Sequence, residues 1–193
     1  MQRTLVIFLK EPRPGRVKTR LGRQIGMIEA AWWYRHQAGR LIRRLDCDRR
    51  WRTVLGVSPD SEGLTSRVWP AHPPRWPQGT GDLGRRMGRA LRAMPPGPVI
   101  IVGADIPGLW PAHVAEGFGL LGRHDAVLGP APDGGYWMIG LRRGGRAVPA
   151  GLFGGVRWSS SHALADTVAS LAPLEAGFAA TLRDVDQAAD LCS

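Results

Sequence analysis

Short runs of aliphatic residues alternate along the chain with longer stretches in which apolar residues recur at helical spacing. The aliphatic runs predict strands at residues 4–9, 53–57, 99–103, 125–129 and 136–141. The periodic stretches predict helices at residues 25–45, 83–91, 111–122 and 162–171. A loop or edge strand is expected at residues 68–77, and a short strand with an acidic end at residues 181–186. Such alternation is typical of an α/β fold with a mostly parallel mixed sheet.

The run V-I-I-V-G at residues 99–103 is the most apolar strand, as expected for a strand covered on both faces. Asp105 follows it, at the end where open α/β sheets bind their ligands, although this residue could instead cap the next helix. A second acid, Asp133, lies in a turn between two later strands and is followed by Gly134 and Gly135. Two acids on neighbouring strand ends suggest a metal or phosphate site.

Two loops have the composition of phosphate or nucleotide sites. The first, at residues 10–20, combines prolines and a glycine with Lys18, Thr19 and Arg20, but it lacks the spacing of a P-loop. The second, Q-G-T-G-D-L-G at residues 78–84, enters a helix and could present backbone amides to an anion. The alternative for this loop is an ordinary capped helix with Asp82 as N-cap.

Length and charge limit the class of protein. At 193 residues and 44% hydrophobic, the chain is expected to form a single domain over residues 1–193. The net charge of +10 arises in residues 1–52, which hold 14 Lys and Arg against 4 acids. This basic third could bind nucleic acid, a membrane surface or a phosphorylated small molecule. Cys47 and Cys192 lack metal or redox spacing, which favours free thiols in a cytoplasmic protein without a membrane span.

Six ordered motifs resemble those of one family across nearly the whole length. The chain resembles the selenodomain-associated transferases, which are glycosyltransferase-like members of the GT-A-like nucleotide-diphospho-sugar transferase superfamily. Their relatives include molybdenum-cofactor nucleotidyltransferases and phospholactate guanylyltransferases. The motifs are F-L-K-E-P-R-P-G-R-V-K-T-R-L, Q-G-T-G-D-L-G-R-R-M, I-V-G-A-D-I-P-G-L, L-G-P-A-P-D-G-G-Y-W-M-I-G-L, L-F-G-G-V-R-W-S-S and L-R-D-V-D. The resemblance implies a three-layer α/β/α sandwich with a nucleotide bound at the carboxyl edge of its sheet.

The resemblance also implies roles for individual residues. The nucleotide-binding set comprises Lys10, Gly15, Arg16, Lys18, Arg20, Gln78, Gly81, Asp82 and Gly84. The acceptor side comprises Asp133, Gly134, Gly135 and Trp158. The metal ligands implied for Mg²⁺ or Mn²⁺ are Asp105, Asp184 and Asp186, and the catalytic residues are Asp105, Asp133 and Lys18. The D-x-D motif of GT-A glycosyltransferases is reduced here to a single acid, as in the nucleotidyltransferases.

These observations predict a metal-dependent transferase that takes a nucleotide or nucleotide-sugar donor and a small-molecule acceptor. Either a sugar moves from a nucleotide sugar, or a nucleotidyl group moves from a triphosphate to a phosphorylated acceptor. The alternative is a non-catalytic protein that binds nucleotides or nucleic acid through its basic third. The acids at the strand ends would repel a polyanion, so nucleic acid is not the expected partner.

Overall fold

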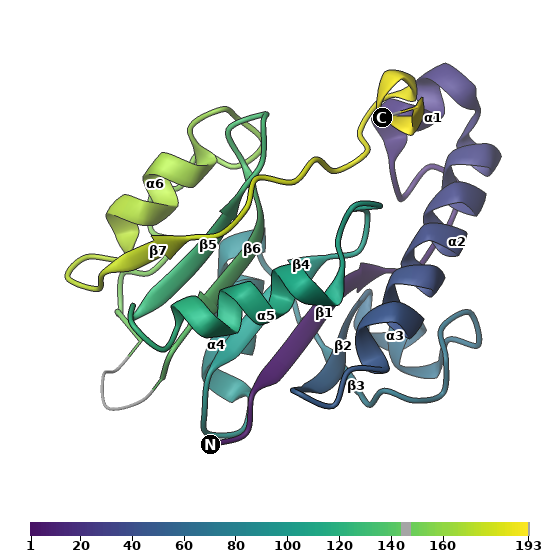
Figure 1. Ribbon diagram of the computed structural model, residues 1–193. Helices are drawn as coiled ribbons and strands as arrows, with labels where there is room; N and C mark the ends of the chain where they lie inside the picture. The colour runs from purple at the N-terminus through teal and green to yellow at the C-terminus, as the bar shows by residue number, and fades with distance from the viewer. Residues whose placement is uncertain (144–147, 193) are drawn as a thin grey trace.

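The computed structural model describes residues 1–143 and 148–192, which form one seven-stranded sheet flanked by helices (Figure 1). The sheet order is β3-β2-β1-β4-β6-β5-β7, and β6 is the strand that runs antiparallel to its neighbours. The strands are β1 (Thr4–Lys10), β2 (Arg52–Ser58), β3 (Arg75–Pro77), β4 (Val99–Gly103), β5 (Ala126–Pro130), β6 (Tyr136–Leu141) and β7 (Ala176–Phe178). The helices are α1 (Thr19–Ile25), α2 (Met27–Asp46), α3 (Asp60–Thr65), α4 (Leu83–Ala93), α5 (Pro111–Leu120), α6 (Ala163–Ser170) and the 3₁₀ helix η1 (Ala188–Cys192).

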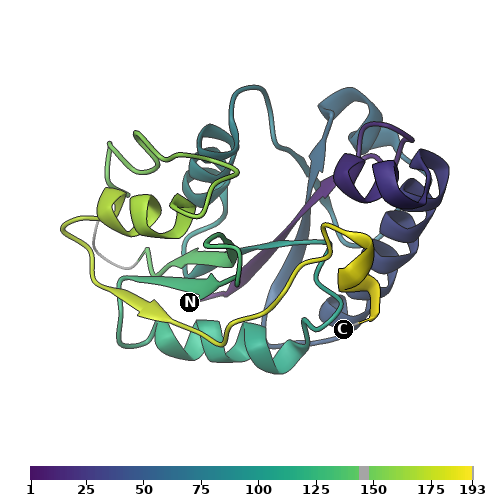
Figure 2. The same ribbon diagram turned by 90° about the horizontal axis from the view of Figure 1, so that it is seen from above.

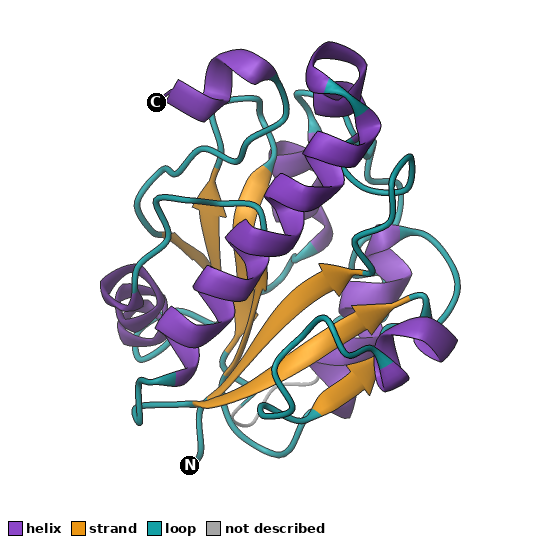
Figure 3. Cartoon of the chain, turned by 90° about the vertical axis from the view of Figure 1, so that its right-hand side faces the viewer, coloured by secondary structure: helices purple, strands orange, loops and turns teal. Residues whose placement is uncertain are grey.

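Two hydrophobic cores lie on opposite faces of the sheet and make the fold a three-layer sandwich (Figure 3). Successive side chains of a strand point to opposite faces. On β1, Leu5 and Ile7 therefore join the core beneath α2 and α5, whereas Val6 joins the core beneath α4 and α6. This arrangement confirms the predicted α/β fold with its mostly parallel mixed sheet.

The antiparallel direction of β6 decides where the site forms. The parallel strands all end at one edge of the sheet, and β6 begins at that edge because it runs the opposite way. The turn that precedes β6 carries Asp133, and the end of β4 leads to Asp105. The two acids predicted on neighbouring strand ends therefore lie at the same edge.

The helix predicted at residues 25–45 is confirmed by α2, which begins two residues later, but the separate helix α1 before it was not expected. The chain forms two helices, α1 and α2, separated by Gly26 at φ +104, a backbone conformation that side chains rarely adopt. Within α2, Ile28 and Trp32 are exposed although their spacing resembles that of a core face, because the buried stripe of the helix passes through Ala31, Tyr34 and Ala38 instead. Helical periodicity records only the regular part of a segment and does not detect such a break.

The strand expected at residues 181–186 is wrong, because the last strand is β7 at Ala176–Phe178. The residues that follow run along the carboxyl edge of the sheet and reach α1 (Figure 2). Their backbone N–H groups donate at intervals to loops and strand ends, as in the 3.1 Å bond from Val185 to the carbonyl oxygen of Asp105. The Val185 side chain is buried with Leu21 and Ala30, which fixes this segment against α1 and α2.

Two expectations concern the cysteines and membrane spans. Cys47 is a free, exposed thiol, whereas the side chain of Cys192 lies outside the described part of the structure. Among the described residues, no helix combines the length and apolar character that crossing a bilayer requires.

Candidate functional site

A cleft of about 630 Å³ lies at the carboxyl edge of the sheet, and we call it the main cleft. Segments from both ends of the sequence line it, since the loop after β1 and the segment after β7 meet over the end of β4. Four basic and four acidic side chains are among its lining residues. They are Lys10, Lys18, Arg20, Arg86, Asp105, Asp133, Asp184 and Asp186. The structure thus brings together eight charged groups that are far apart in the sequence.

Lys18 lies at the centre of an acidic cluster. Its Nζ is 2.5 Å from Asp105 Oδ2, 2.7 Å from Asp186 Oδ1 and 3.6 Å from Asp184 Oδ2, and only 8% of its side chain is exposed. Lys18 is also the N-cap of α1 and has the left-handed φ of +45. Such strain in a lysine persists only where the surroundings enforce it, and it is common at functional sites.

At Lys18, burial and the neighbouring charges shift the pKa in opposite directions, whereas at Asp184 burial and the neighbouring carboxylates both raise it. Burial lowers the pKa of the Lys18 ammonium, but attraction and hydrogen bonding by Asp105 and Asp186 outweigh it, so the pKa is raised. Burial, together with the neighbouring charges of Asp105 and Asp186, raises the pKa of Asp184 to about 6, although Lys18 opposes this. One ammonium therefore balances three carboxylates only in part, and Asp184 retains affinity for a proton near neutral pH.

The same carboxylates are the ones predicted to bind a metal. Their oxygens are the hard ligands that Mg²⁺ and Mn²⁺ favour, so Asp105, Asp184 and Asp186 fit a divalent cation in kind. Within the described residues, however, no three His, Cys, Asp or Glu side chains form a ready-made metal group. The Lys18 ammonium lies where the three carboxylates converge. Metal binding would therefore require Lys18 to move away from them.

The residues of the predicted phosphate loop lie in two different places, some in the main cleft and some against α3. Lys10, Lys18 and Arg20 line the main cleft, and Arg20 pairs with Asp186 at 3.3 Å while remaining 63% exposed. Arg16 instead points to α3, where its guanidinium pairs with Glu62 at 3.2 Å.

Gly15 occupies a turn at φ +74 and is not among the lining residues of the main cleft. Arg13 also pairs with Glu62, so this part of the loop contacts α3, which composition alone did not indicate.

The second predicted nucleotide loop has mainly structural contacts. Gln78 reaches the cleft, but it is buried, and its Nε2 donates to the carbonyl oxygens of Leu9 and Gly56 at 3.1 and 2.7 Å. Asp82 caps α4, because its Oδ1 accepts the N–H of Arg85 at 2.8 Å. The alternative of a capped helix therefore describes Asp82.

The glycines of this loop serve its shape and packing. A Cβ on Gly84 would lie 2.6 Å from the Cβ of Phe153, so this glycine permits close contact between α4 and the segment before α6. Gly81 has φ +104, and its backbone oxygen accepts a 2.8 Å bond from Arg86 Nε. Neither glycine is among the lining residues of the main cleft.

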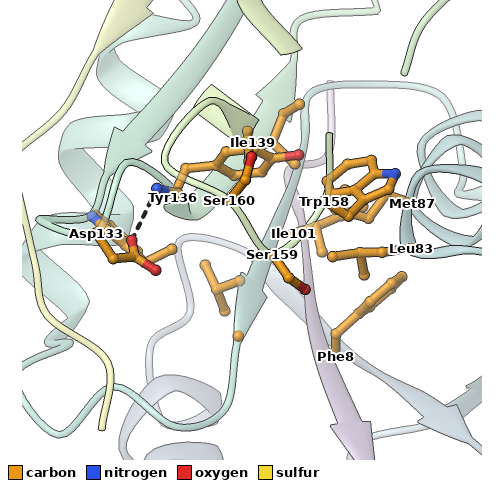
Figure 4. A pocket seen from close by; sticks show the side chains of 15 residues that line it. Phe8, Leu83, Met87, Ile101, Asp133, Tyr136, Ile139, Trp158, Ser159 and Ser160 are labelled. Atoms are coloured by element: carbon orange, nitrogen blue, oxygen red, sulfur yellow. Dashed lines mark hydrogen bonds between the residues drawn. The ribbon is translucent and has the colours of Figure 1, made fainter. Parts of the chain in front are cut away.

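A smaller cavity of about 220 Å³ adjoins the main cleft, and we call it the side cavity (Figure 4). It contains three of the four predicted acceptor residues, namely Asp133, Gly135 and Trp158. The N–H of Gly135 donates to Asp133 Oδ1 at 2.9 Å, which fixes the carboxylate at the junction of the two spaces. Gly134 serves the turn instead, because a Cβ there would lie 2.2 Å from the backbone oxygen of Ser161.

Sequence reasoning missed several lining residues of the main cleft. Tyr34 is 5% exposed, and its hydroxyl accepts the backbone N–H of Lys10 at 3.1 Å, yet in sequence it is one apolar position of a helix. Arg86 also lines the cleft and follows the second glycine-rich loop, where its place in the R-R-M motif was the available signal. The three serines at residues 159–161 border the cleft as well.

Comparison with solved structures finds several proteins of the same fold. A protein of Desulfovibrio desulfuricans G20, provisionally assigned as a nucleotide-diphospho-sugar transferase, matches with a TM-score of 0.83 and 30% identity over 97% of this chain and 84% of that chain. The 4-diphosphocytidyl-2C-methyl-D-erythritol synthase of Anaerococcus prevotii matches with a TM-score of 0.59 and 9% identity, over 99% and 95% of the two chains. No protein with a curated description matches the sequence.

A third match concerns a metal. The protein Rv0371c of Mycobacterium tuberculosis, in a complex with manganese, matches with a TM-score of 0.51 and 15% identity over 100% of this chain and 96% of that chain. At this identity the likeness shows the fold alone. The family model for DUF2064, described as an uncharacterized protein conserved in bacteria, matches residues 41–160. The chain therefore belongs to the DUF2064 family and is similar in fold and sequence to the nucleotide-diphospho-sugar transferase-like protein of D. desulfuricans.

Proposed function

We propose that this protein is a metal-dependent transferase that binds a nucleotide or nucleotide-sugar donor in the main cleft. The observation that carries the proposal is the convergence of Lys18 with Asp105, Asp184 and Asp186 at the carboxyl end of β4. Open α/β sheets bind their ligands at this edge, and excess carboxylate charge there favours a cation. The similarity to a transferase-like protein at 30% identity supports the same class of function.

The residues of the cleft divide into two roles. Lys10, Arg20 and Arg86 are the cationic groups that can approach the donor phosphates, because all three line the cleft. The three aspartates would hold Mg²⁺ or Mn²⁺, which when bound supplies positive charge to phosphate oxygens. Lys18 would then leave the carboxylates, and its ammonium becomes available to the same phosphates.

Two chemistries remain compatible with these roles. In glycosyl transfer a nucleoside diphosphate leaves, whereas in nucleotidyl transfer pyrophosphate leaves. The motifs resembling selenodomain-associated transferases favour the first, and the single acid at Asp105 favours the second. Product analysis separates them, since a triphosphate that yields pyrophosphate selects nucleotidyl transfer.

The test of the proposal is ligand-dependent stability against heat. A nucleotide with Mn²⁺ or Mg²⁺ at about 100 times its dissociation constant adds roughly 2.7 kcal/mol, which is about 5–10 °C for a chain of this size. Triphosphates or nucleotide sugars should give larger shifts than monophosphates, because the cationic residues contact phosphates. The panel is run with each metal and with chelator.

Two exposed arginines make a matched pair for this test. Arg20→Ala removes a cation from the cleft and should reduce the shift, whereas Arg49→Ala removes one from the turn before β2, at the opposite edge of the sheet, and should not. If no nucleotide or nucleotide sugar produces a metal-dependent shift, the proposal is refuted. Salt-sensitive binding of DNA or RNA that survives Asp105→Asn would favour the nucleic-acid alternative instead.

A further inference from the structure

The side cavity has mainly apolar walls. Phe8, Leu83, Met87, Ile101, Ile139 and Trp158 are among its lining residues, contributed by β1, α4, β4, β6 and the segment before α6 (Figure 4). Leu83 lines both the side cavity and the main cleft and is 44% exposed. A ligand in the side cavity would therefore cover part of this apolar side chain.

The volume of the cavity indicates the size of that ligand. An apolar cavity of about 150 Å³ holds a benzene molecule. The 220 Å³ of the side cavity therefore accommodates a six-membered ring with a substituent, or a branched chain of similar bulk. Ligand pockets typically combine such walls with a few polar groups that orient the ligand. Here those groups are Asp133, Ser159 and Ser160, which also line the main cleft.

The charge of the cavity excludes one class of ligand. Among the described residues that line it, none is a lysine or arginine, and Asp133 is the charged one. A phosphate placed there would find no cation and would be repelled by the Asp133 carboxylate. The side cavity therefore differs from the main cleft, where cationic side chains are available.

We propose that the side cavity binds the acceptor, and that the acceptor is a hydroxyl compound whose buried part is uncharged and apolar. This inference rests on the proposed function, because the main cleft must hold the donor. The hydroxyl lies at Asp133, at the junction of the two spaces. Its oxygen bonds to the transferred group, the bond from that group to the departing phosphate breaks, the phosphate retains the electron pair, and Asp133 takes the hydroxyl proton. A phosphorylated acceptor does not fit this cavity.

Benzyl alcohol and benzyl phosphate are a matched pair of probes for this site. Binding of each to the full chain is measured by ligand-observed NMR and by titration calorimetry. Benzyl alcohol should bind, and benzyl phosphate should bind at least about tenfold more weakly, because the cavity offers its charge no partner. Equal or tighter binding of the phosphate that is lost on Ala163→Leu, and so takes place in the side cavity rather than in the cationic main cleft, would overturn the proposal.

Two variants locate the binding. Ala163→Leu adds bulk at a residue that lines the side cavity and is not a lining residue of the main cleft, so it should abolish binding of benzyl alcohol. Leu83→Gln changes an exposed side chain and should weaken binding about threefold to tenfold, through lost apolar contact. Leu64→Gln, at a leucine of α3 that is 42% exposed, is the matched control and should leave binding unchanged.

The outcomes separate this inference from the proposed function. If Ala163→Leu does not fold, Leu83→Gln against Leu64→Gln decides the location. Nucleotide-dependent stabilisation without binding of benzyl alcohol, or binding that the cavity variants leave intact, refutes the acceptor site alone. Binding of benzyl alcohol at this cavity with no nucleotide effect refutes the transferase proposal and leaves an apolar ligand site.

Discussion

Asp184→Asn should stabilise the metal-free protein at neutral and alkaline pH. The Asp184 carboxylate is crowded by burial and by the charges of Asp105 and Asp186, and its pKa is raised to about 6. Its closest cation, the Lys18 ammonium, is 3.6 Å away and closer to both other carboxylates. Asparagine has nearly the same size without the charge. The variant therefore removes repulsion and forfeits only a weak ion pair.

The magnitude and its pH dependence follow from the pKa. A rise from 3.8 to about 6 is about two units, or about 3 kcal/mol at roughly 1.4 kcal/mol per unit. The side chain is 32% exposed, so solvent screening reduces this to about 1–3 kcal/mol. Because the folded-state pKa is raised, the protonated form stabilises the fold below pH 4, and this contribution is lost as the pH rises through 6. The variant and the parent should therefore be equally stable near pH 4 and differ fully above pH 7.

Urea unfolding of both proteins with chelator, from pH 4 to pH 8, measures the difference. Asp166→Asn is a control of opposite sign, since paired hydrogen bonds from Arg157 hold the pKa of the Asp166 carboxyl well below its usual range. That variant should be less stable than the parent at neutral pH, and its deficit should shrink in acid. A difference for Asp184→Asn that does not change with pH, or a loss of stability at pH 8, would refute the reasoning.

Two further substitutions test the scaffold of the cleft. Tyr34→Phe removes the acceptor of the partly buried backbone N–H of Lys10 and should cost about 0.5–1.5 kcal/mol in chemical unfolding, whereas an unchanged midpoint would show that water replaces the hydroxyl. Gly134→Ala should destabilise by more than Gly151→Ala, because a Cβ at residue 134 meets the Ser161 backbone and a Cβ at residue 151 meets open space; equal melting temperatures would contradict this.

Strand positions could be predicted from the sequence because a strand buried on both faces needs an unbroken aliphatic run. The run at residues 99–103 became β4 at the centre of the sheet, and Asp105 after it reached the cleft. Turn chemistry was equally informative at Asp133, where the following glycines indicated a tight turn. These features are local, so a single segment contains all the information they require.

What the sequence did not reveal depends on contacts between distant segments. Nothing local to Lys18 indicates that its ammonium meets Asp186, 168 residues away, because that contact depends on the path of residues after β7. In sequence, Arg16 and Arg20 are equal candidates for binding a phosphate, because both are arginines of the same basic loop. Arg16 nevertheless pairs with Glu62 of α3 outside the cleft, whereas Arg20 pairs with Asp186 inside it. The resemblance alone assigned Asp133, Gly135 and Trp158 to the acceptor side. The apolar walls of the side cavity were not predicted, because Phe8 and Leu83 are ordinary apolar positions by pattern.

The path of residues 179–187 also determines when the cleft can exist during synthesis. Domains begin to form from the N-terminal side while the chain is being made. The strands from β1 to β6 can pair at that stage, but the Lys18 ammonium then faces Asp105 without Asp184 or Asp186. Val185 fixes the two late acids by joining Leu21 and Ala30 in a shared core. A nascent chain therefore has a nearly complete scaffold before it has a binding site, and it acquires the site in one late docking step.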